Sequence, residues 1–465
     1  MTESRHVPTG DRTIRYTGSG DISDLVRRLS EQDVDVVRVQ YADLLGIARS
    51  KDVPLRELER VSRAGLSFCQ GVFLTTLRAD VIDGPGGPST GLPDLHVHLP
   101  PGVVRVVPWE PGVAVAVGDT TTAHGQPAAI GPRNVLARVV ERFTERGLSP
   151  VIGPELEFYL CRRDEAGRLV RTIHRTGAVY MNGPTVDPGG VLLRMMRQIG
   201  DLDLGVFAAN HEFSPSQYEI NIWHSDAVDA ADRCFLLKSS IKDIAALSGL
   251  HATFVGKPFN DEGGSGFHLH VSLGQVGRDG NAFDDPAAVD GLSATARHFL
   301  GGVLRHADAV SALLNPTVNA YKRLQPDSLA PYRANWGLDN RTTFVRVPPD
   351  RGAGTRLELR SGDGTANPYL ATAAVLAAGL DGIDRAVEPP PAEDGWTYAA
   401  EDTSAGADLP RTLDAALAAL DASTVLRAQL GDALVDTFLT LKRDECDRYA
   451  RWVTDWELEE YADHL

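Results

Sequence analysis

Charged and imidazole side chains recur on alternate residues at several places in this chain, with apolar residues between and around them. The members of this pattern are Glu155 and Glu157, His268 and His270, and Glu358 and Arg360. In a β-strand, residues i and i+2 project from the same face, so Leu156 and Phe158 are expected to pack in a core while the glutamates point the other way. Half-buried charges on converging strands need a partner, because their desolvation is costly. The pattern therefore predicts a metal-centred site built on a β-sheet.

A further pair of glutamates, Glu212 and Glu219, lies in the segment NHEFSPSQYEINIW. Several carboxylate oxygens with one or two imidazoles suit Mg²⁺ or Mn²⁺ better than zinc, which prefers Cys and His in a closed tetrahedron. The four cysteines stand singly and form no CxxC pair; they are Cys69, Cys161, Cys234 and Cys446. They fit neither a zinc site nor a disulfide framework, and are expected to be reduced thiols.

The composition limits the class of partner. The chain has 465 residues and a formal net charge of −17, which argues against nucleic acid and against anionic membrane as general partners. The N-terminal segment MTESRHVPTGDRTIR lacks the apolar core of a signal peptide, and the apolar stretch from Tyr369 to Leu380 is too short to span a membrane. We expect a soluble cytoplasmic protein.

Polar and turn-forming stretches divide the chain into units. Residues 1–20 are rich in Gly, Ser and Thr, which predicts a flexible tail. A first unit spans residues 21–120, and the segment DTTTAHGQPAAIGPRN at its end is interpreted as a linker. The second unit, residues 130–465, alternates motif-bearing strands with helices expected near residues 132–146, 188–200, 229–247, 288–315 and 367–384. Trp109 and Trp223 are interpreted as packing residues.

The sequence contains neither a Walker A loop nor a G-x-G-x-x-G motif after a strand. It does contain a dense cationic region that extends from Lys322 to Arg360. The other members of this region are Arg323, Arg333, Arg341, Arg346, Arg351 and Arg356. Arginines clamp phosphates or carboxylates through paired hydrogen bonds. Metal ions and arginines together are what phosphoryl transfer requires.

Six motifs resemble the glutamine synthetase family in order, spacing and context: PELEF, NHEFSPSQYEI, GSGFHLHVS, NAYKRL, NRTTFVRVP and RLELRSGDGTANPYL. The resemblance implies an α+β fold, with an N-terminal β-grasp-like domain over residues 21–120 and a large catalytic α/β domain over residues 130–465 that holds a curved antiparallel sheet. It also implies a homo-oligomer of hexameric rings stacked as a dodecamer. Each active site would then lie between neighbouring subunits.

The resemblance also implies which residues hold the cofactors. These would be two or three Mg²⁺ or Mn²⁺ ions per site, with ATP as cosubstrate. One cation, nearest the amino-acid substrate, would be held by Glu157, Glu212 and Glu219. The cation at the nucleotide phosphates would be held by Glu155, His268 and Glu358.

The same motifs imply the substrate contacts. Glutamate would be bound by Arg323, Arg360 and Gly264, the phosphates by Arg341 and Arg346, and the nucleotide also by His270, Ser272 and Arg356. Arg323, Arg341 and Arg360 are therefore candidate catalytic residues. Arg341 and Arg346 lie on opposite faces of a regular strand, so both can serve only if the chain between them bends or bulges.

In the implied reaction, the γ-carboxylate of glutamate attacks the γ-phosphate of ATP, and an amine then attacks the resulting acyl phosphate. Two departures from the family pattern concern this amine. Ammonia-using members carry an Asp-Gly-Ser-Ser sequence in the N-terminal domain and a flap glutamate after the KRL motif. This chain has Cys69 and Gln70 in the first place and Leu329 in the second. The loss of two anions should weaken the capture of ammonium.

These departures resemble the glutamate–amine ligase branch, whose members make γ-glutamylamides from polyamines or monoamines. The preferred prediction is therefore an ATP-dependent glutamate–amine ligase with Cys69, Gln70 and Leu329 in its amine pocket. Asp327 is a candidate substitute carboxylate, so an ammonia-dependent glutamine synthetase is the alternative. A catalytically silent member with a structural or regulatory role is the third hypothesis.

Two smaller departures concern substrate binding and regulation. Gly263 stands where ammonia-using members usually have Asn, so glutamate binding is expected to lack one side-chain hydrogen bond in comparison with them. Ala407 replaces the tyrosine that is adenylylated in some bacterial members, so regulation by that modification is not expected.

Overall fold

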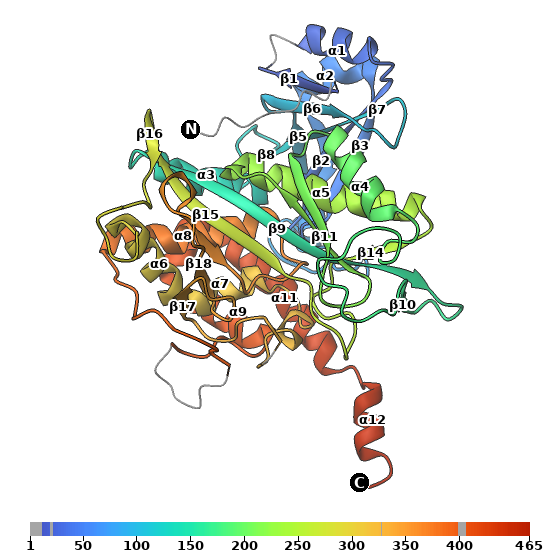
Figure 1. Cartoon of the computed structure of the whole chain (residues 1–465). Helices are drawn as coiled ribbons and strands as arrows, with labels where there is room; N and C mark the ends of the chain where they lie inside the picture. The colour runs from blue at the N-terminus through green and yellow to red at the C-terminus, as the bar shows by residue number, and fades with distance from the viewer. Residues whose placement is uncertain (1–11, 19–21, 327, 399–405) are drawn as a thin grey trace.

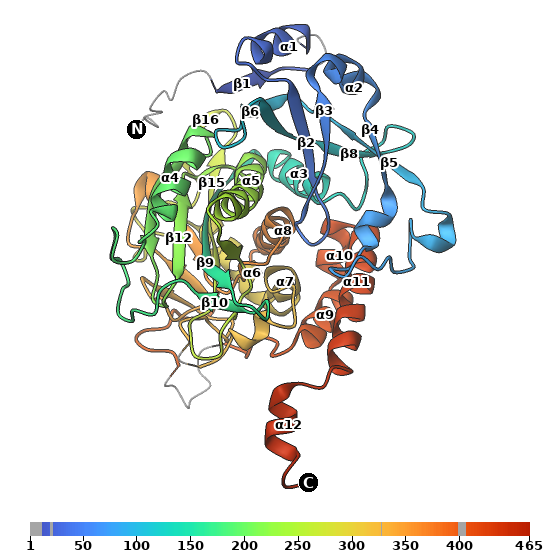
Figure 2. The ribbon, with the colours of Figure 1, turned by 90° about the vertical axis from the view of Figure 1, so that its right-hand side faces the viewer.

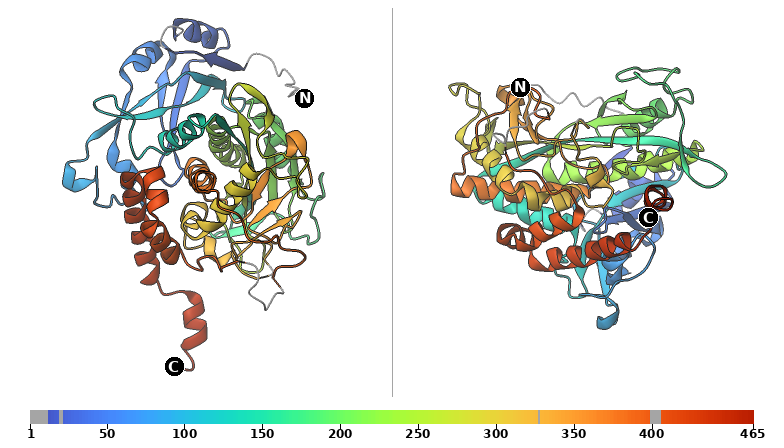
Figure 3. Two further views of the ribbon diagram at one scale, coloured as in Figure 1. Left: turned by 90° about the vertical axis from the view of Figure 1, so that its left-hand side faces the viewer. Right: turned by 90° about the horizontal axis from the view of Figure 1, so that it is seen from below.

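A computed structural model describes residues 12–18, 22–326, 328–398 and 406–465. Its strands form three β-sheets within this part of the chain. Figure 1 shows the N-terminal strands and helices at the top of the molecule, and the long strands of the largest sheet across the middle with helices packed against them. The C-terminal helices lie along one side of this body, as both views in Figure 3 show.

The five-stranded sheet contains most of the N-terminal strands. Its strands, in spatial order, are β1 (Thr13–Tyr16), β6 (Gly102–Val106), β7 (Val113–Val117), β2 (Val36–Ala42) and β3 (Ala48–Pro54). The helices α1 (Ile22–Ser30) and α2 (Leu58–Ala64) lie beside it (Figure 2). The prediction of a flexible tail is wrong for residues 13–16, because β1 pairs with β6 and buries Ile14 and Tyr16. Residues 1–11, 19 and 20 of that predicted tail lie outside the described residues.

A second, three-stranded sheet consists of β4 (Leu66–Cys69), β5 (Asp94–His98) and β8 (Asp119–Thr122). The predicted linker is wrong at both ends, because β8 forms its start and helix α3 (Pro132–Thr144) begins before its end. The Asn134 side chain donates a hydrogen bond to the carbonyl of Thr120 at 2.6 Å, which fixes one end of this segment to the other.

The largest sheet carries the motifs found in the sequence. Its path runs through β11 (Val206–His211), β12 (Gln217–Ile222), β9 (Leu148–Arg163), β15 (Phe267–Gln275), β19 (Leu357–Leu359), β18 (Val345–Val347) and β17 (Trp336–Leu338). Shorter strands pair at its sides: β10 (Leu169–Arg171), β13 (Ser225–Asp226) and β14 (His251–Thr253) with β9, and β16 (Arg278–Asn281) with β15. All of these pairs are antiparallel except β17 with β18. A mixed fold with a large, mostly antiparallel sheet confirms the predicted fold class.

The remaining helices begin close to the predicted ranges and continue to the end of the chain. They are α4 (Val191–Asp201), α5 (Ala227–Leu247), α6 (Ala294–Arg305), α7 (Ala307–Leu314), α8 (Pro368–Arg385), α9 (Leu413–Ala422), α10 (Thr424–Leu430), α11 (Asp432–Ala450) and α12 (Asp455–Tyr461). Short 3₁₀ helices span Leu55–Glu57, Gln70–Leu74, Pro88–Thr90, Ala320–Lys322 and Gly352–Gly354. The single helix predicted over residues 288–315 is two helices, which meet at His306; its Nε2 lies 2.8 Å from a carboxylate oxygen of Asp381 on α8.

Helix α8 lies in the centre of the molecule and is buried almost all round. Asn367 caps its first turn by accepting a hydrogen bond from the backbone N–H of Tyr369. The amide group of the same side chain donates to the carbonyl of Asp43 at 2.8 Å, between β2 and β3. One residue therefore joins the N-terminal sheet to the helix that supports the largest sheet.

The C-terminal helix α12 projects from the body of the molecule (Figures 1 and 2). Apolar side chains on and next to it are exposed, namely Trp452, Val453, Trp456, Leu458, Tyr461 and Leu465. In the described part of the chain, no helix combines the length and the apolar character that crossing a membrane would require.

Candidate active site

The register of neighbouring strands brings the alternating charged residues together. β15 pairs with β9 so that His268 lies opposite Glu155, and β19 pairs with β15 so that Glu358 lies opposite His270. Side chains of directly opposite residues in an antiparallel pair lie on the same face, about 5 Å apart at Cβ. The ladder thus builds one face of carboxylates and imidazoles from residues that are far apart in the sequence.

Strand β9 has one apolar and one charged face, as its alternation predicts. Leu156 and Phe158 are buried in the core, whereas Glu155 and Glu157 are half-buried on the other face. β12 pairs with β9 along the edge that faces away from β15, and there Glu219 lies opposite Glu157. The predicted separation of core and charged side chains along this strand is confirmed.

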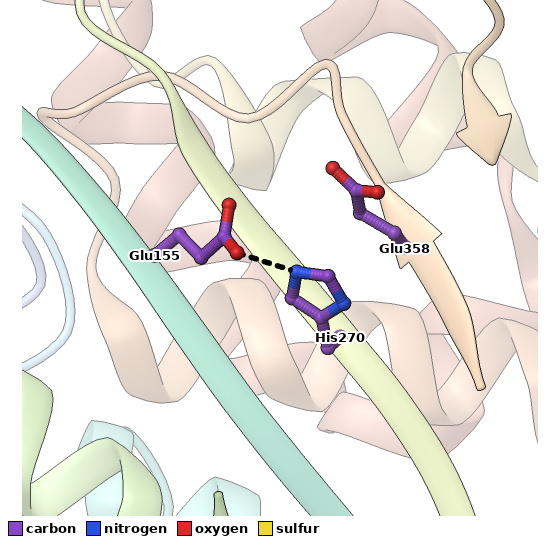
Figure 4. A group of neighbouring side chains, drawn as sticks. All are labelled: Glu155, His270 and Glu358. Atoms are coloured by element: carbon purple, nitrogen blue, oxygen red, sulfur yellow. Dashed lines mark hydrogen bonds and ion pairs between the residues drawn. The ribbon is translucent and has the colours of Figure 1, made fainter. Parts of the chain in front are cut away.

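Two groups of possible cation ligands form on this face, and in each group the ligand atoms lie within 4.8 Å of one another. One group is Glu155, His270 and Glu358, and the other is Glu155, Glu219 and His268. Figure 4 shows the first group, with the two carboxylates on either side of the His270 ring. Carboxylate oxygens with two imidazoles fit a hard divalent cation such as Mg²⁺ or Mn²⁺. His270 is one of the alternating residues that predict a metal-centred site, and the family resemblance implies that it contacts the nucleotide. In the structure it belongs to a candidate cation site.

Glu155 is common to both groups and contacts both imidazoles. One carboxylate oxygen lies 3.3 Å from Nδ1 of His268, and the other lies 2.9 Å from Nε2 of His270. Nε of Arg356 donates to Nδ1 of His270 at 3.1 Å, so the proton of the neutral His270 ring lies on Nε2 and points to Glu155. Burial acts to raise the pKa of Glu155, but the hydrogen bonds from His268 and His270 outweigh it and hold this pKa well below its usual range.

Glu358 is buried and paired with two arginines. Nη1 of Arg346 donates to one oxygen at 2.6 Å, and Nη1 of Arg360 donates to the other. Burial acts to raise the pKa of Glu358, but the charge of Arg360, helped by the nearby imidazoles, lowers it to about 2. Glu155 and Glu358 are therefore ionised at neutral pH and can act as cation ligands.

Glu212 and Glu219 behave in the opposite way. Burial, followed by the charge of Glu157, raises the pKa of Glu212 to about 7. Burial and the charges of Glu155, Glu157 and Glu212 raise the pKa of Glu219 well above its usual range. Carboxylates that repel one another in a buried site are stabilised in the charged form by a cation between them.

We expect cation affinity to rise with pH across neutrality. Because Glu212 keeps its proton up to a pH of about 7, a cation must displace that proton, which weakens its binding by up to about tenfold for each pH unit below 7. Titration calorimetry with Mn²⁺ between pH 6 and 8 measures this slope. The Glu212→Gln variant has no such proton to lose and should show a flatter profile. Cation affinity that is independent of pH in the wild-type protein would contradict the assignment of Glu212 as a cation ligand.

Glu157 is positioned from two sides. One of its oxygens accepts hydrogen bonds from Nε2 of Gln217 at 3.0 Å and from the backbone N–H of Gly266 at 2.7 Å. Gln217 also donates to the carbonyl of Gly264 at 3.1 Å. The glycine segment before β15 is thereby held next to the carboxylate face.

The structure brings the predicted glutamate-binding residues together. A side chain at Gly264 would place its Cβ 2.6 Å from Cγ and Cδ of Arg323 and 2.5 Å from the carbonyl oxygen of Gly256, so only glycine fits. Arg323 is buried and donates to the carbonyls of Ser361 at 2.9 Å and Arg360 at 3.3 Å. The neighbouring Gly263 has the Ser214 hydroxyl 3.0 Å from a Cβ built on it, so the Asn of other family members would displace that hydroxyl.

The two predicted phosphate-binding arginines do not lie on one regular strand. Arg346 is in β18, and its guanidinium contacts Asp339 and Glu358, both at 2.6 Å. Arg341 lies in a turn before the strand, is exposed, and accepts a hydrogen bond from Nε of Arg360 at its backbone carbonyl, 3.0 Å away. The required bend is therefore present, and the two side chains differ in their freedom to bind a phosphate.

The structure has one cavity of about 410 Å³ beside the N-terminal sheet and a second of about 320 Å³. The second lies next to the carboxylate face and is lined by Glu155, His270, Ser272 and Arg356. It therefore contains the three residues that the sequence predicted as nucleotide contacts, together with one predicted metal ligand.

Two aromatic residues at the rim of this second cavity were missed by the sequence analysis. Phe207 and Trp223 both line it, with ring centroids 4.5 Å apart and planes inclined by 31°. Trp223 is 55% exposed, so its interpretation as a packing residue is wrong, whereas Trp109 is half-buried against the core as expected. The only signal in the sequence was the position of Trp223 directly after the motif-bearing strand β12.

The predicted amine-pocket residues are not brought together within one chain. Cys69 and Gln70 end β4 and begin a 3₁₀ helix in the three-stranded sheet. Figure 2 and the left view of Figure 3 both show this sheet at the edge of the molecule, apart from β9 and β15. Leu329 follows the NAYKRL motif, is 40% exposed, and has a φ of 57°. Asp327 lies outside the described residues.

Comparison with known proteins identifies the family. Residues 129–461 match the family model of the glutamine synthetase catalytic domain. The chain is 34% identical to glutamine synthetase from Halobacterium salinarum, over 94% of this chain and 95% of the relative. It is 35% identical to glutamine synthetase from Staphylococcus aureus strain MW2, over 94% and 97%.

Solved structures agree with this result. A ligand-free GmaS has a TM-score of 0.84 and 33% identity, covering 95% of this chain and 100% of that chain. GmaS with ADP, in its first conformation, has the same score and identity and covers 95% and 99%. A novel glutamine synthase homolog has a TM-score of 0.79 and 28% identity, covering 92% and 98%. Fold and site thus define a ligase, and the chain belongs to the glutamine synthetase family.

Proposed function

We propose that this protein is an ATP-dependent ligase that joins the γ-carboxylate of glutamate to an organic amine through a γ-glutamyl phosphate. The observation that carries the choice of amine is the absence of both family acids that attract ammonium, with Cys69 and Gln70 in one place and Leu329 in the other. Likeness over 95% of the chain to GmaS, a glutamate–amine ligase, supports the same choice.

The proposed role of the glycine segment and its arginines is to hold glutamate. Arg323 faces Gly264 at close range and is assigned to the α-carboxylate, and Arg360, fixed by Glu358 and the carbonyl of Arg341, is assigned to the γ-carboxylate. A fixed guanidinium orients a carboxylate with little loss of side-chain entropy on binding. These contacts would hold the γ-carboxylate in place for attack on phosphorus.

The carboxylate face would hold the divalent cations. Glu155, Glu358, His268 and His270 are proposed as ligands beside the nucleotide phosphates, and Glu157, Glu212 and Glu219 as ligands nearer glutamate. Bound Mg²⁺ or Mn²⁺ supplies positive charge that reduces the repulsion between the two reacting anions. Arg341, whose side chain makes no hydrogen bond with any described residue, is free to bind the transferred phosphoryl group.

The Phe207–Trp223 pair is proposed as a platform for the nucleotide base. Stacking of a base on an aromatic ring contributes about 1–3 kcal/mol, so Trp223→Ala should raise the KM for ATP about tenfold and leave the KM for glutamate almost unchanged. Trp396, which is 53% exposed, offers a matched control. Steady-state kinetics in which Trp223→Ala matches Trp396→Ala would reject the platform.

A glutamine synthetase that uses ammonia is the second candidate, and one observation favours it. The curated relatives at 34% and 35% identity carry that name. The two candidates differ in the charge of the amine pocket, so a test should change that charge.

Introducing an acid at Leu329 should shift the preference toward ammonium. A carboxylate near the attacking nitrogen attracts ammonium and can accept its proton, so Leu329→Glu should raise kcat/KM for ammonium by about tenfold and lower it for an alkyl amine. Leu338→Glu is the matched control, because Leu338 is 45% exposed on β17. Initial rates of phosphate release give both ratios. An unchanged ratio in Leu329→Glu would place the amine elsewhere.

The placement of Cys69 and Gln70 supports an assembly in which a neighbouring chain completes the amine pocket. Within one chain these residues lie in the three-stranded sheet, apart from the carboxylate face. The projecting α12, with Trp456 and Leu458 exposed, provides apolar surface for a further subunit contact. We propose the stacked hexameric rings of the family. Sedimentation velocity tests this proposal, and an active monomer would contradict it.

A further inference from the structure

The larger of these two cavities lies away from the proposed catalytic face. It has a volume of about 410 Å³ and is enclosed by the N-terminal sheet, helix α3 and the start of helix α5. Figures 1 and 2 both show β6 of that sheet above α5. The cavity of about 320 Å³ beside the carboxylate face, called the nucleotide cavity below, shares no lining residue with the larger cavity. The volume of the larger cavity is in the range of roughly 300–1,000 Å³ that is usual for small-molecule sites.

The most unusual residue in this cavity is Arg105 of β6. It is only 5% exposed, and its guanidinium makes no hydrogen bond with any residue that the structure describes. Its Nε is buried without a partner. Burial lowers the pKa of Arg105, although guanidinium groups are basic enough to stay charged. A buried cation without a hydrogen-bond partner is costly, and such groups are rare in native proteins.

The acidic residues around the cavity are already engaged. Asp229 pairs with Arg233 at 2.7 Å, and Asp232 pairs with Arg133 at 2.9 Å. Asp232 also accepts a hydrogen bond from the hydroxyl of Tyr369. Of the other two, Asp226 caps α5 by accepting from the N–H of Asp229, and Asp203 has a partner of its own.

Two donor atoms of the cavity, in contrast, have no partner among the described residues. Nε of Arg233 is buried without a partner, as is Nε of Arg105, and Arg15 lines the rim as an exposed residue. The charges of Asp229, Asp203 and Asp232 act to raise the pKa of Arg105 against the effect of burial. No carboxylate of the described residues accepts a hydrogen bond from its Nε, so an anion would supply the acceptor that this group lacks. Carboxylates and phosphates match the two parallel N–H groups of an arginine.

We infer that this cavity binds a small anion that carries a carboxylate or phosphate group, with Arg105 as its buried anchor and Arg15 at the rim. The inference rests on residues of the N-terminal sheet and α5, and does not depend on the proposed ligase reaction. The ligand would join the N-terminal sheet to helix α5. This helix directly follows β13, and β13 begins two residues after Trp223, which lines the cavity beside the carboxylate face.

Calorimetric titration of the intact protein with succinate and with inorganic phosphate tests this inference, without ATP or glutamate and with chloride to keep the ionic strength constant. We expect one saturable site per subunit for at least one of the two anions, and the preferred anion identifies the ligand group. Arg105→Met should weaken this binding by at least about tenfold, because a charged, two-pronged contact is lost. Arg105→Lys keeps the charge without the paired N–H groups and should give an intermediate affinity.

The matched control is Arg341→Met, which makes the same substitution beside the proposed catalytic face. It reports any anion that binds at the catalytic face instead, and the site at Arg105 should stay saturable in this variant. If Arg105→Met does not fold, Arg15→Met at the exposed rim replaces it and should weaken binding several-fold. Binding that is lost in Arg341→Met but kept in Arg105→Met and Arg15→Met, or no saturable binding of either anion, would overturn the inference.

Discussion

Replacing Glu155 by glutamine is expected to reduce ATP-dependent phosphate release by about three orders of magnitude, since several kcal/mol of charge stabilisation are lost and each 1.4 kcal/mol is worth about tenfold. The effect should be large because Glu155 belongs to both groups of candidate ligands and contacts both His268 and His270. Glutamine keeps the size of the side chain and removes its charge. Phosphate release with saturating ATP, glutamate and amine measures the loss.

The control for this experiment is Glu145→Gln, which removes an exposed carboxylate after helix α3. It should have wild-type activity. The cation affinity of Glu155→Gln should fall together with its rate, while its circular dichroism spectrum stays that of the wild-type protein. A Glu155→Gln variant within tenfold of the wild-type rate would contradict the proposed cation site.

Replacing Gly264 by alanine is the second change with a large expected effect. The new Cβ would lie 2.5 Å from the carbonyl oxygen of Gly256 and 2.6 Å from the side chain of Arg323, so the backbone or the arginine must move. A displacement of about 1 Å at a positioning group can reduce the rate about 100-fold, and we expect kcat/KM for glutamate to fall by about this factor. The KM for ATP should change little, because the nucleotide cavity is lined by other residues.

Gly200→Ala is the matched control for Gly264→Ala. Gly200 lies in helix α4, and a Cβ built on it meets nothing within 4 Å. Alanine is preferred to glycine inside a helix by about 1 kcal/mol, so this variant should be fully active and slightly more stable. Equal kinetic constants for glutamate in the two variants would show that the glycine segment does not contact glutamate.

Much of the site follows from local sequence, because the alternation of charged and apolar residues is a property of one strand. The period of two residues is enough to assign Glu155 and Glu157 to one face of β9, and His268 and His270 to one face of β15. The residues that share a cation depend on strand register, which a single strand does not determine. The pairing of β15 with β19 brings His270 to the Glu358 group, and this pairing is a property of the tertiary fold.

Other features depend on local irregularities or on long-range packing. A β-bulge at Phe207 interrupts the pairing of β11 with β12, and a period of two residues does not predict it. Ile14 and Tyr16 form a strand only because β6 lies beside them, although their surroundings have the composition of a flexible segment. Arg105 resembles any exposed strand arginine in the sequence, and only the packing of β6 over α5 buries it.

The central claim is that an organic amine, and not ammonium, is the second substrate. Its most direct test is kcat/KM for a panel of ammonium, methylamine, ethanolamine, putrescine and spermidine, measured by phosphate release with ATP, Mg²⁺ and glutamate, with the product identified by mass spectrometry. We expect one organic amine to exceed ammonium by at least about 100-fold, which corresponds to about 2.7 kcal/mol, and to yield its γ-glutamylamide. Ammonium as the best substrate, with glutamine as the product, would contradict the account.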